Sequence, residues 1–189
     1  MKVLLLGPYR QRLIDFFASQ GDSVQWFEER ISIEMKIVQE SDWLISYGYR
    51  YLICREVLEK FKNNAINLHI SYLPWNRGAD PNLWSFLEDT PKGVTIHLIA
   101  PTLDTGDIVV QRTVDFGNTD TLRTSYDKLT VEIEDLLKNI WSSLKQGLIQ
   151  PQMQPTGGSF HKMIDKDRYM PLLSKGWDTP LHCLRGKAL

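Results

Sequence analysis

Residues 2–8 read Lys-Val-Leu-Leu-Leu-Gly-Pro, a short aliphatic run that ends at a glycine and a proline. An uninterrupted apolar run of this length is typical of a strand buried on both faces of a parallel sheet. The Gly-Pro pair indicates the turn that ends the strand. The first seven residues after Met1 therefore predict the first strand of an α/β fold.

The chain alternates between helical and strand-like segments as far as residue 71. Short connections between such segments imply βαβ units, and hence a mostly parallel sheet with helices on both faces. In open sheets of this kind, ligands bind beyond the carboxyl ends of the strands. The expected elements are a helix at 12–19, a strand at 24–27, a short helix at 31–39, a strand at 43–47, a helix at 55–62 and a strand at 65–71.

The second half of the chain has a different pattern. It holds a Pro-, Asn- and Gly-rich loop, one long amphipathic helix that Gly147 ends, and a Pro- and Gly-rich tail that we expect to form an extended arm. We therefore expect a catalytic domain at 1–150 and a C-terminal arm at 151–189. The remaining expected elements are a loop at 73–81, a helix at 82–88, strands at 93–100 and 108–114, and the long helix at 121–145.

Composition excludes several broad classes of protein. The chain has 189 residues, 42% apolar and 24% charged, which suits one ordinary globular domain. A net charge of −1 gives no general attraction to nucleic acid or to an anionic membrane. No stretch approaches the ~20 apolar residues of a membrane span. Two isolated cysteines, Cys54 and Cys183, favour a reducing compartment, so we expect a cytoplasmic protein without nucleic-acid or membrane partners.

Two polar signals stand out against this background. Asn67 and His69 lie two apart on a predicted strand, so their side chains point to the same face. Asp104 begins a tight acidic loop after another predicted strand. Taken separately, each is as well explained by a hydrogen-bonded strand end or an ordinary turn. Together they would supply an imidazole, a carboxylate that orients it and an amide donor.

Four short motifs around these residues resemble the formyltransferases that use 10-formyltetrahydrofolate. That family includes methionyl-tRNA formyltransferase, glycinamide ribonucleotide formyltransferase and the sugar N-formyltransferases. The motifs occur in the family's order, and the resemblance implies a Rossmann-like fold from residue 1 to about 147. The motifs are 67–74 (Asn-Leu-His-Ile-Ser-Tyr-Leu-Pro), 77–79 (Arg-Gly-Ala), 93–97 (Gly-Val-Thr-Ile-His) and 103–108 (Leu-Asp-Thr-Gly-Asp-Ile).

The resemblance implies that Asn67, His69 and Asp104 are the catalytic residues. A substrate amine would attack the formyl carbon, and the oxyanion that forms needs hydrogen-bond donors. We assign this role to the Asn67 amide and to a protonated or donating His69. Asp104 would orient His69, favour its charged form and help to move the amine proton. The chemistry requires no metal.

The resemblance also implies a folate site formed by the main chain of two loops, one after the strand at 43–47 and one before Asp104. Main-chain recognition tolerates variation in the side chains. Tyr49 and Tyr51 are equally well explained as core or surface aromatics. The residues expected to bind 10-formyltetrahydrofolate are Gly48, Tyr49, Arg50, Tyr51, Leu52, Ile53, Ala100, Leu103 and Asp104.

The loop at 73–85 and the tail most resemble short sugar N-formyltransferases associated with bacterial surface polysaccharides, and the formylation domains of peptide synthetases. We therefore expect the acceptor to be a small-molecule amine, the amine of a nucleotide-linked amino sugar. Trp84 could instead anchor its own helix, and Arg77 its own loop. The expected substrate-binding residues are Tyr72, Trp75, Arg77, Gly78, Asn82 and Trp84.

Other functions remain open at this stage. The acceptor could be glycinamide ribonucleotide or a carrier-bound aminoacyl group. A folate-binding module without turnover is a third hypothesis, which the intact Asn67, His69 and Asp104 disfavour. Aromatic positions in the tail are compatible with a homodimer, and we expect His161 and His182 on the surface.

Overall fold

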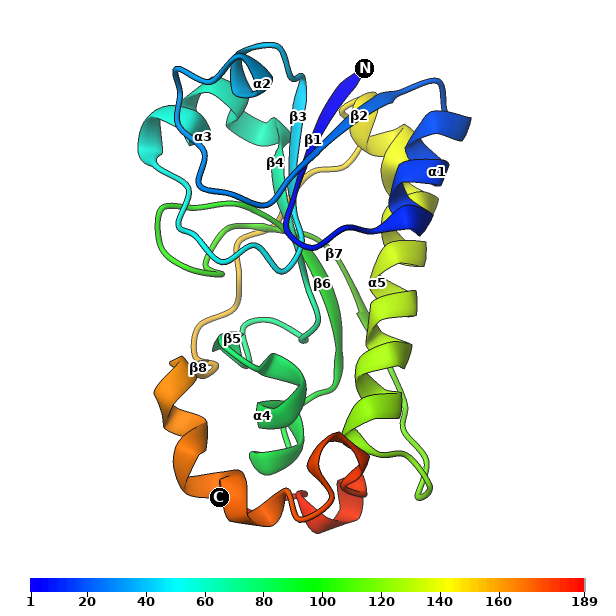
Figure 1. Ribbon diagram of the computed structural model, residues 1–189, viewed down its shortest axis with the longest axis vertical. Coiled ribbons are helices and arrows are strands. Elements are labelled where there is room, and N and C mark those ends of the chain that lie inside the picture. Colours follow the sequence, from blue (N-terminus) through cyan, green and yellow to red (C-terminus); the bar gives the residue numbers. More distant parts are fainter. Residues whose placement is uncertain (189) are drawn as a thin grey trace.

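The computed structural model describes residues 1–188, which fold around a central six-stranded sheet (Figure 1). The strands lie in the order β2-β1-β3-β4-β6-β7. The first four are parallel, whereas β6 and β7 run antiparallel to their neighbours. The predicted α/β fold with a mostly parallel sheet is confirmed. The strands are β1 (Lys2–Leu6), β2 (Ser23–Phe27), β3 (Trp43–Ser46), β4 (Ala65–His69), β6 (Gly93–Leu98) and β7 (Ile108–Thr113).

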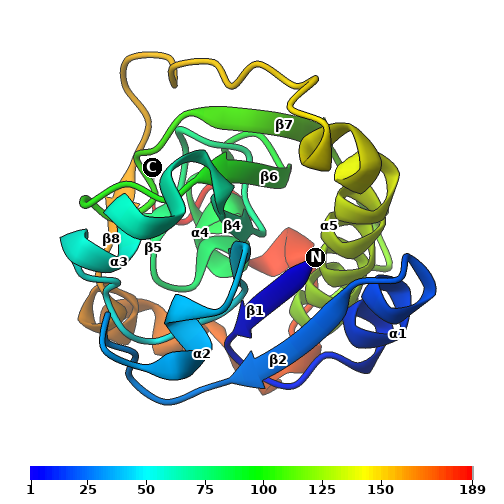
Figure 2. The same ribbon diagram turned by 90° about the horizontal axis from the view of Figure 1, so that it is seen from above.

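Helices cover both faces of the sheet, as the alternating pattern predicts (Figure 2). One face packs against α1 (Gln11–Ser19) and α5 (Leu122–Lys145), where Trp141 is fully buried. The other face packs against α2 (Lys36–Gln39) and α3 (Arg55–Phe61). The predicted helix at 31–39 is shorter than expected, because Met35 has an extended backbone and the helix begins after it.

The long helix α5 has the ends that its sequence predicts. The Thr121 hydroxyl accepts a hydrogen bond from the main-chain N–H of Thr124, which satisfies one of the free donors at the start of the helix. Gly147 follows the last turn with φ at +67°, a left-handed conformation that costs glycine little. Between these ends the helix buries one apolar face against the sheet.

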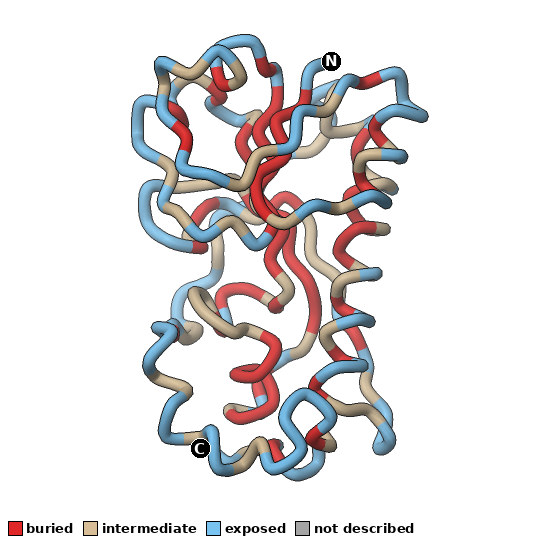
Figure 3. Tube along the Cα trace, in the orientation of Figure 1, coloured by how far each residue is buried: buried red, intermediate tan, exposed pale blue. Residues whose placement is uncertain are grey.

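The C-terminal arm wraps around α4 (Pro81–Leu87) at the end of the molecule farthest from the N-terminus (Figure 1). Its first contact is a two-stranded ladder between β5 (Arg77–Gly78) and β8 (Phe160–His161). Six residues of α4 are buried, and the burial map shows this helix enclosed by the arm (Figure 3). The short 3-10 helices are η1 (Lys62–Asn64), η2 (Met163–Leu172), η3 (Gly176–Asp178) and η4 (Leu181–Cys183).

Two properties of the described residues bear on the sequence predictions. His161 is 8% exposed, so the expectation of a surface residue is wrong: it faces α4 through the β5–β8 ladder. No helix among residues 1–188 is long and apolar enough to cross a membrane.

Candidate active site

The strand register brings the predicted site residues to the carboxyl ends of the parallel strands. Leu6 at the end of β1 pairs with Ser46 at the end of β3, and Ser46 pairs with Asn67 of β4. Across the next, antiparallel pair, Asn67 lies opposite His97. His69 lies two residues beyond Asn67 and therefore shares its face of the sheet. This is the face that α2 and α3 cover, at the point where their cover ends.

Asp104 completes the cluster from a loop that returns after β6. Its Oδ1 accepts a hydrogen bond from Asn67 Nδ2 at 3.2 Å, and its Oδ2 accepts one from the main-chain N–H of Gly78 at 2.9 Å. The residue has φ at +54°, in the left-handed region that few residues other than glycine adopt. The structure thus brings Asn67, His69 and Asp104 together, although Asp104 is 35 or more positions further along the chain.

His69 is oriented by a main-chain carbonyl. Its Nε2 lies 3.1 Å from the carbonyl oxygen of Asn76. Because a carbonyl only accepts, Nε2 carries the hydrogen, and Nδ1 of the neutral ring holds a free lone pair. Nδ1 faces Asp104 Oδ2 at 3.8 Å, beyond hydrogen-bond distance. The ring is thereby set to accept a proton at Nδ1.

Burial decides the charge of the two ionisable groups. It lowers the pKa of His69, although the nearby Asp104 carboxylate opposes this shift. Burial alone would raise the pKa of Asp104, but the charge interaction with His69 and the contacts of His97 and Gly78 outweigh it and lower that pKa. At neutral pH the pair is an ionised carboxylate beside a neutral imidazole. The expectation of a protonated, donating His69 is therefore not supported, because its N–H is bound to Asn76.

His97 is a fourth member of the cluster that we did not assign to the site. Its Nδ1 lies 2.8 Å from the carbonyl oxygen of Leu98, so that nitrogen carries the hydrogen. Its Nε2 lies 3.2 Å from Asn67 Nδ2 and 3.4 Å from Asp104 Oδ1. The sequence signal was present in the motif at 93–97, but the pairing of His97 with Asn67 depends on an antiparallel neighbour that the local pattern does not specify.

The two predicted folate loops lie beside each other (Figures 1 and 2). Ile53 from the first and Ile99 from the start of the second pack on the same apolar cluster. Leu52 and Leu103 are 75% and 43% exposed. Among the described residues, no hydrogen bond joins a main-chain group of 48–53 to the rest of the chain. Both loops therefore present apolar side chains, and the first also presents free main-chain donors and acceptors.

Tyr49 has a structural role in this region. Its hydroxyl accepts from the main-chain N–H of Ile31 and donates to the carbonyl of Glu29, which ties the loop to the segment after β2. Its ring meets that of Tyr51 edge to face, at 5.5 Å between centroids. The core alternative that we left open for these tyrosines is the one that the contacts of Tyr49 favour. Gly48, Arg50 and Ala100 lie at least partly exposed on the same loops.

Several predicted substrate-binding residues are used inside the protein. Asn82 is 4% exposed, and its amide bonds the carbonyl of Leu122 and the hydroxyl of Ser125 on α5. Arg77 donates to the carbonyl of Gly157 in the arm at 3.1 Å. The structure does not support a ligand-binding role for Asn82, and it gives Arg77 the loop-anchoring role of the alternative hypothesis.

The other predicted substrate residues surround the catalytic cluster. Gly78 touches it directly through its bond to Asp104. Trp75 is 37% exposed, and Tyr72 is partly exposed. These residues keep the surface that a substrate contact needs. Their assignment to substrate binding stays a prediction.

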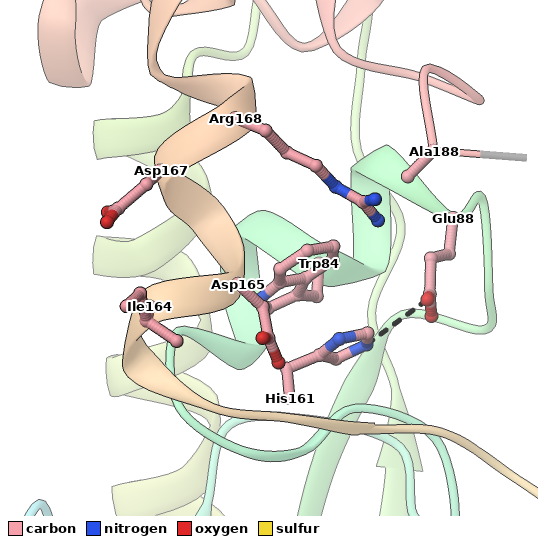
Figure 4. A pocket seen from close by; sticks show the side chains of 8 residues that line it. All are labelled: Trp84, Glu88, His161, Ile164, Asp165, Asp167, Arg168 and Ala188. Atoms are coloured by element: carbon pink, nitrogen blue, oxygen red, sulfur yellow. Dashed lines mark ion pairs between the residues drawn. The ribbon is translucent and has the colours of Figure 1, made fainter.

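Trp84 lies in the wall of a pocket of about 410 Å³ between α4 and the arm (Figure 4). The indole is 1% exposed and stacks on the His161 ring, with centroids 3.8 Å apart and planes at 5°. His161 Nε2 in turn lies 3.2 Å from Glu88 Oε1. Because His161 occupies the face of Trp84, the structure does not support stacking of this indole on a sugar or base. Trp84 holds the arm against α4.

The described residues contain no group of three or more His, Cys, Asp and Glu side chains that could hold a metal ion. The chemistry available to the cluster is therefore that of its own groups. A neutral imidazole can take a proton at Nδ1, an ionised carboxylate can stabilise the cation that forms, and an amide can donate hydrogen bonds.

Comparisons with known proteins agree with this geometry. The family model described as "Formyl transferase" matches residues 20–139. Methionyl-tRNA formyltransferase from Clostridium beijerinckii is 33% identical over 141 residues, which are 74% of this chain and 46% of that protein. The corresponding protein from Clostridium novyi is 34% identical over 167 residues, or 87% of this chain and 54% of the relative. The chain thus spans about half the length of the curated relatives it matches.

A solved structure matches the whole chain. The formyltransferase PseJ from Anoxybacillus kamchatkensis, in complex with UDP-4,6-dideoxy-4-formamido-L-AltNAc and tetrahydrofolate, is 54% identical. The match covers 100% of both chains with a TM-score of 0.97. A sugar N-formyltransferase from a Shewanella species is 22% identical with a TM-score of 0.74, covers 87% of this chain and 78% of that chain, and shows the shared fold. By the family model and by these relatives, the chain belongs to the formyl transferase family.

Proposed function

We propose that this protein transfers the formyl group of 10-formyltetrahydrofolate to the amine of a UDP-linked amino sugar. The observation that carries the proposal is the 54% identity, over the full length of both chains, to a formyltransferase solved with a UDP-linked formamido sugar and tetrahydrofolate. The cluster of Asn67, His69 and Asp104 supports it from the chemical side, since each of the three has a task in amine formylation.

His69 activates the attacking amine. As the amine nitrogen forms its bond to the formyl carbon, it becomes positively charged and acidic. The free lone pair of Nδ1 accepts that proton, because Nε2 already holds its hydrogen on the Asn76 carbonyl. The neutral state that burial favours is the state that this step needs.

Asp104 stabilises the imidazolium that results. A carboxylate at 3.8 Å from Nδ1 gains a full charge interaction once the ring is protonated, in a site shielded from water. The same proton then passes to the nitrogen of the folate as its bond to the formyl carbon breaks. The charge on His69 exists only during the reaction, so the carboxylate acts mainly on the transition state.

Asn67 donates to the oxygen that becomes negative during the attack. In the ligand-free geometry its amide hydrogens point to Asp104 Oδ1 and to His97 Nε2, both at 3.2 Å. These contacts are long for hydrogen bonds, so an oxyanion replaces one of them at small cost. His97 thereby holds the amide of Asn67 in the plane where the substrate oxygen will meet it.

The two loops at 48–53 and 100–104 suit a flat heterocycle that carries amide-like edges. Leu52 and Leu103 offer apolar contact, and the free main-chain groups of the first loop offer donors and acceptors. Bound there, 10-formyltetrahydrofolate supplies the formyl group, and the loops hold its ring system next to Asp104. Main-chain recognition would explain how the loop residues can vary among formyltransferases.

We further propose that residues 1–150 form the catalytic domain and residues 151–189 an arm that belongs to the same body. A homodimer, the lack of a nucleic-acid partner and a cytoplasmic location stay predictions from the sequence.

The test is a direct assay of the amine acceptor. The purified chain is incubated with 10-formyltetrahydrofolate and a UDP-linked 4-amino-4,6-dideoxy sugar, and the products are separated and weighed by mass spectrometry. We expect a sugar nucleotide that has gained one formyl group, and no product with the His69→Ala variant. Formylation of glycinamide ribonucleotide, methionyl-tRNA or a carrier-bound amino acid in place of the sugar would overturn the proposed acceptor. Formylation of none of them would overturn the proposed activity.

A further inference from the structure

Two residues with left-handed backbones hold the active site in place. Asn76, with φ at +58°, presents the carbonyl that orients His69, and Asp104, with φ at +54°, presents the carboxylate. Neither residue is a glycine, so each pays a conformational cost that the surrounding contacts must outweigh. The contacts that hold these two residues therefore decide the geometry of the catalytic groups.

One of these contacts comes from Gln154 in the C-terminal arm. Its side-chain Nε2 donates to the carbonyl of Asp104 at 2.9 Å and to the carbonyl of Gly106 at 2.8 Å. A single NH₂ group thus uses both hydrogens to bridge the two carbonyls of the catalytic loop. The loop is close-packed on its other side, where a Cβ on Gly106 would lie 1.8 Å from the carbonyl oxygen of Leu98. Gln154 completes the enclosure of this loop.

The second contact comes from Ser159, five residues further along the arm. Its hydroxyl accepts from the main-chain N–H of Asn76 at 3.0 Å and donates to Asn76 Oδ1 at 3.1 Å. The Asn76 amide also donates to the Thr90 hydroxyl at 2.8 Å. These bonds fix the peptide whose carbonyl holds the hydrogen of His69 Nε2.

We propose that Gln154 and Ser159 are positioning residues of the formyl transfer reaction, and that the arm is part of the active site through them. The inference rests on the proposed function for its kinetic consequences. Gln154 sets the place of the Asp104 carboxylate, and Ser159 sets the tautomer and the angle of His69. Together they maintain the Nδ1–Oδ2 separation of 3.8 Å that the proton transfer uses.

The arm has other attachments that do not depend on these two side chains. The ladder between β5 and β8, the bond from Arg77 to Gly157 and the apolar cluster around α4 hold it to the body. Loss of the Gln154 amide therefore leaves the arm attached but frees the catalytic loop. This separation makes a positioning role distinguishable from a contribution to folding alone.

The first experiment compares Gln154→Leu with Gln152→Leu. The control removes the same type of side chain from the same arm, at an exposed position whose ladder contacts to Ile108 are made by the main chain. We expect Gln154→Leu to lower kcat by about 10- to 100-fold, the usual effect of losing a group that orients a reacting one. KM values should stay within about twofold, since the binding surfaces are untouched. Gln152→Leu should behave as the parent in every measurement.

A second variant, Ser159→Ala, is smaller and keeps the test valid if Gln154→Leu does not fold. We expect it to lower kcat in the same way and to move the acid limb of the kcat profile, because the orientation of His69 changes. Restoration of activity in Ser159→Thr, which keeps the hydroxyl, would support the assignment. A lower melting temperature with unchanged kcat in folded Gln154→Leu and Ser159→Ala would overturn it.

A readout without turnover separates this inference from the proposed function. The imidazole nitrogens of His69 are followed by NMR as a function of pH in the parent, Gln154→Leu, Ser159→Ala and Gln152→Leu. We expect the titration of His69 to shift in the first two variants and not in the control. An unchanged His69 titration in both variants would overturn the inference whichever amine the enzyme formylates, whereas a shift with no formylated sugar would leave it standing and overturn only the acceptor.

Discussion

The protein contains two buried carboxylates with similar exposure and very different partners. Asp22 is 6% exposed and Asp104 is 8% exposed. Asp22 accepts from the N-terminal ammonium, from the Lys145 ammonium and from the Trp141 indole, each at 2.8 Å. Asp104 accepts from an amide and a main-chain N–H, and it faces the two imidazoles of His69 and His97.

The difference shows how one fold separates stability from chemistry. Cations with permanent charge compensate Asp22, so its site gains from ionisation at all times. Burial alone would raise its pKa, but the bonds from Lys145, the N-terminus and Trp141 lower that pKa to about 2. The partners of Asp104 are neutral until a proton arrives, so the full interaction with a cation is withheld until the reaction creates one. Replacement of each carboxylate should therefore have opposite effects on stability and on rate.

The largest effect is expected from Asp104→Asn. Asparagine keeps the shape of the side chain and tolerates the left-handed backbone, so the fold should persist. The loss of the negative charge removes the partner of protonated His69, and we expect kcat to fall by ~10²- to 10⁴-fold. Steady-state kinetics and circular dichroism on the same preparation check this. Activity within tenfold of the parent, a factor of about 1.4 kcal/mol in the barrier, would contradict the assignment.

Asn67→Ala should follow, with a loss of ~10²- to 10³-fold in kcat, the usual cost of removing one donor to an oxyanion. KM should change little, because the donor acts in the transition state. Asn67→Asp is a useful companion, since it keeps the size but places a negative charge beside Asp104, and it should be no more active than Asn67→Ala. Equal kcat for the parent and Asn67→Ala would exclude the amide from the reaction.

Asp22→Asn should reverse this pattern and leave kcat at 25 °C unchanged. The two ammonium groups lose their counter-charge, and we expect the free energy of unfolding to fall by about 2 kcal/mol, the equivalent of the lowered pKa. For a chain of this size that is a drop in melting temperature of ~4–8 °C. Thermal unfolding followed by fluorescence measures it. A large loss of activity in folded Asp22→Asn would erase the distinction between the two sites.

The smallest effect concerns the stability of the parent in acid. A carboxyl whose pKa is lower in the folded than in the unfolded state stabilises the fold above its unfolded pKa of ~3.9, and this contribution is lost as pH falls. For Asp22 the loss runs from about pH 4 down to about pH 2. The stability difference between the parent and Asp22→Asn should therefore shrink across that interval in denaturant titrations. A difference that stays constant with pH would show that charge is not its cause.

The sequence predicts the frame of the site better than the site's supports. Alternation along β4 puts Asn67 and His69 on one face, and the loop at 103–107 announces Asp104, because those features are local. The signals that Gln154 and Ser159 give are ordinary polar residues in a tail. They meet Asp104 and Asn76 through loops with left-handed backbones, and no local periodicity specifies such a meeting.

The same reasoning explains the substrate residues that were misassigned. Trp84 and Asn82 look accessible in a loop-rich stretch, but they belong to α4, which the arm and α5 enclose from both sides. A tail that folds back over a short helix turns an amphipathic element into a buried one. The pattern of α4 alone does not reveal that second cover, because the covering residues lie about eighty positions further along the chain.

The most direct test of the account is the protonation state of His69 in the ligand-free parent, observed in long-range proton–nitrogen NMR spectra assigned with His69→Gln. The account predicts a neutral ring at pH 7 with the hydrogen on Nε2 and none on Nδ1, and protonation only below the usual range of histidine. An imidazolium at pH 7, or a hydrogen on Nδ1, would contradict the proposal that His69 accepts the proton of the attacking amine.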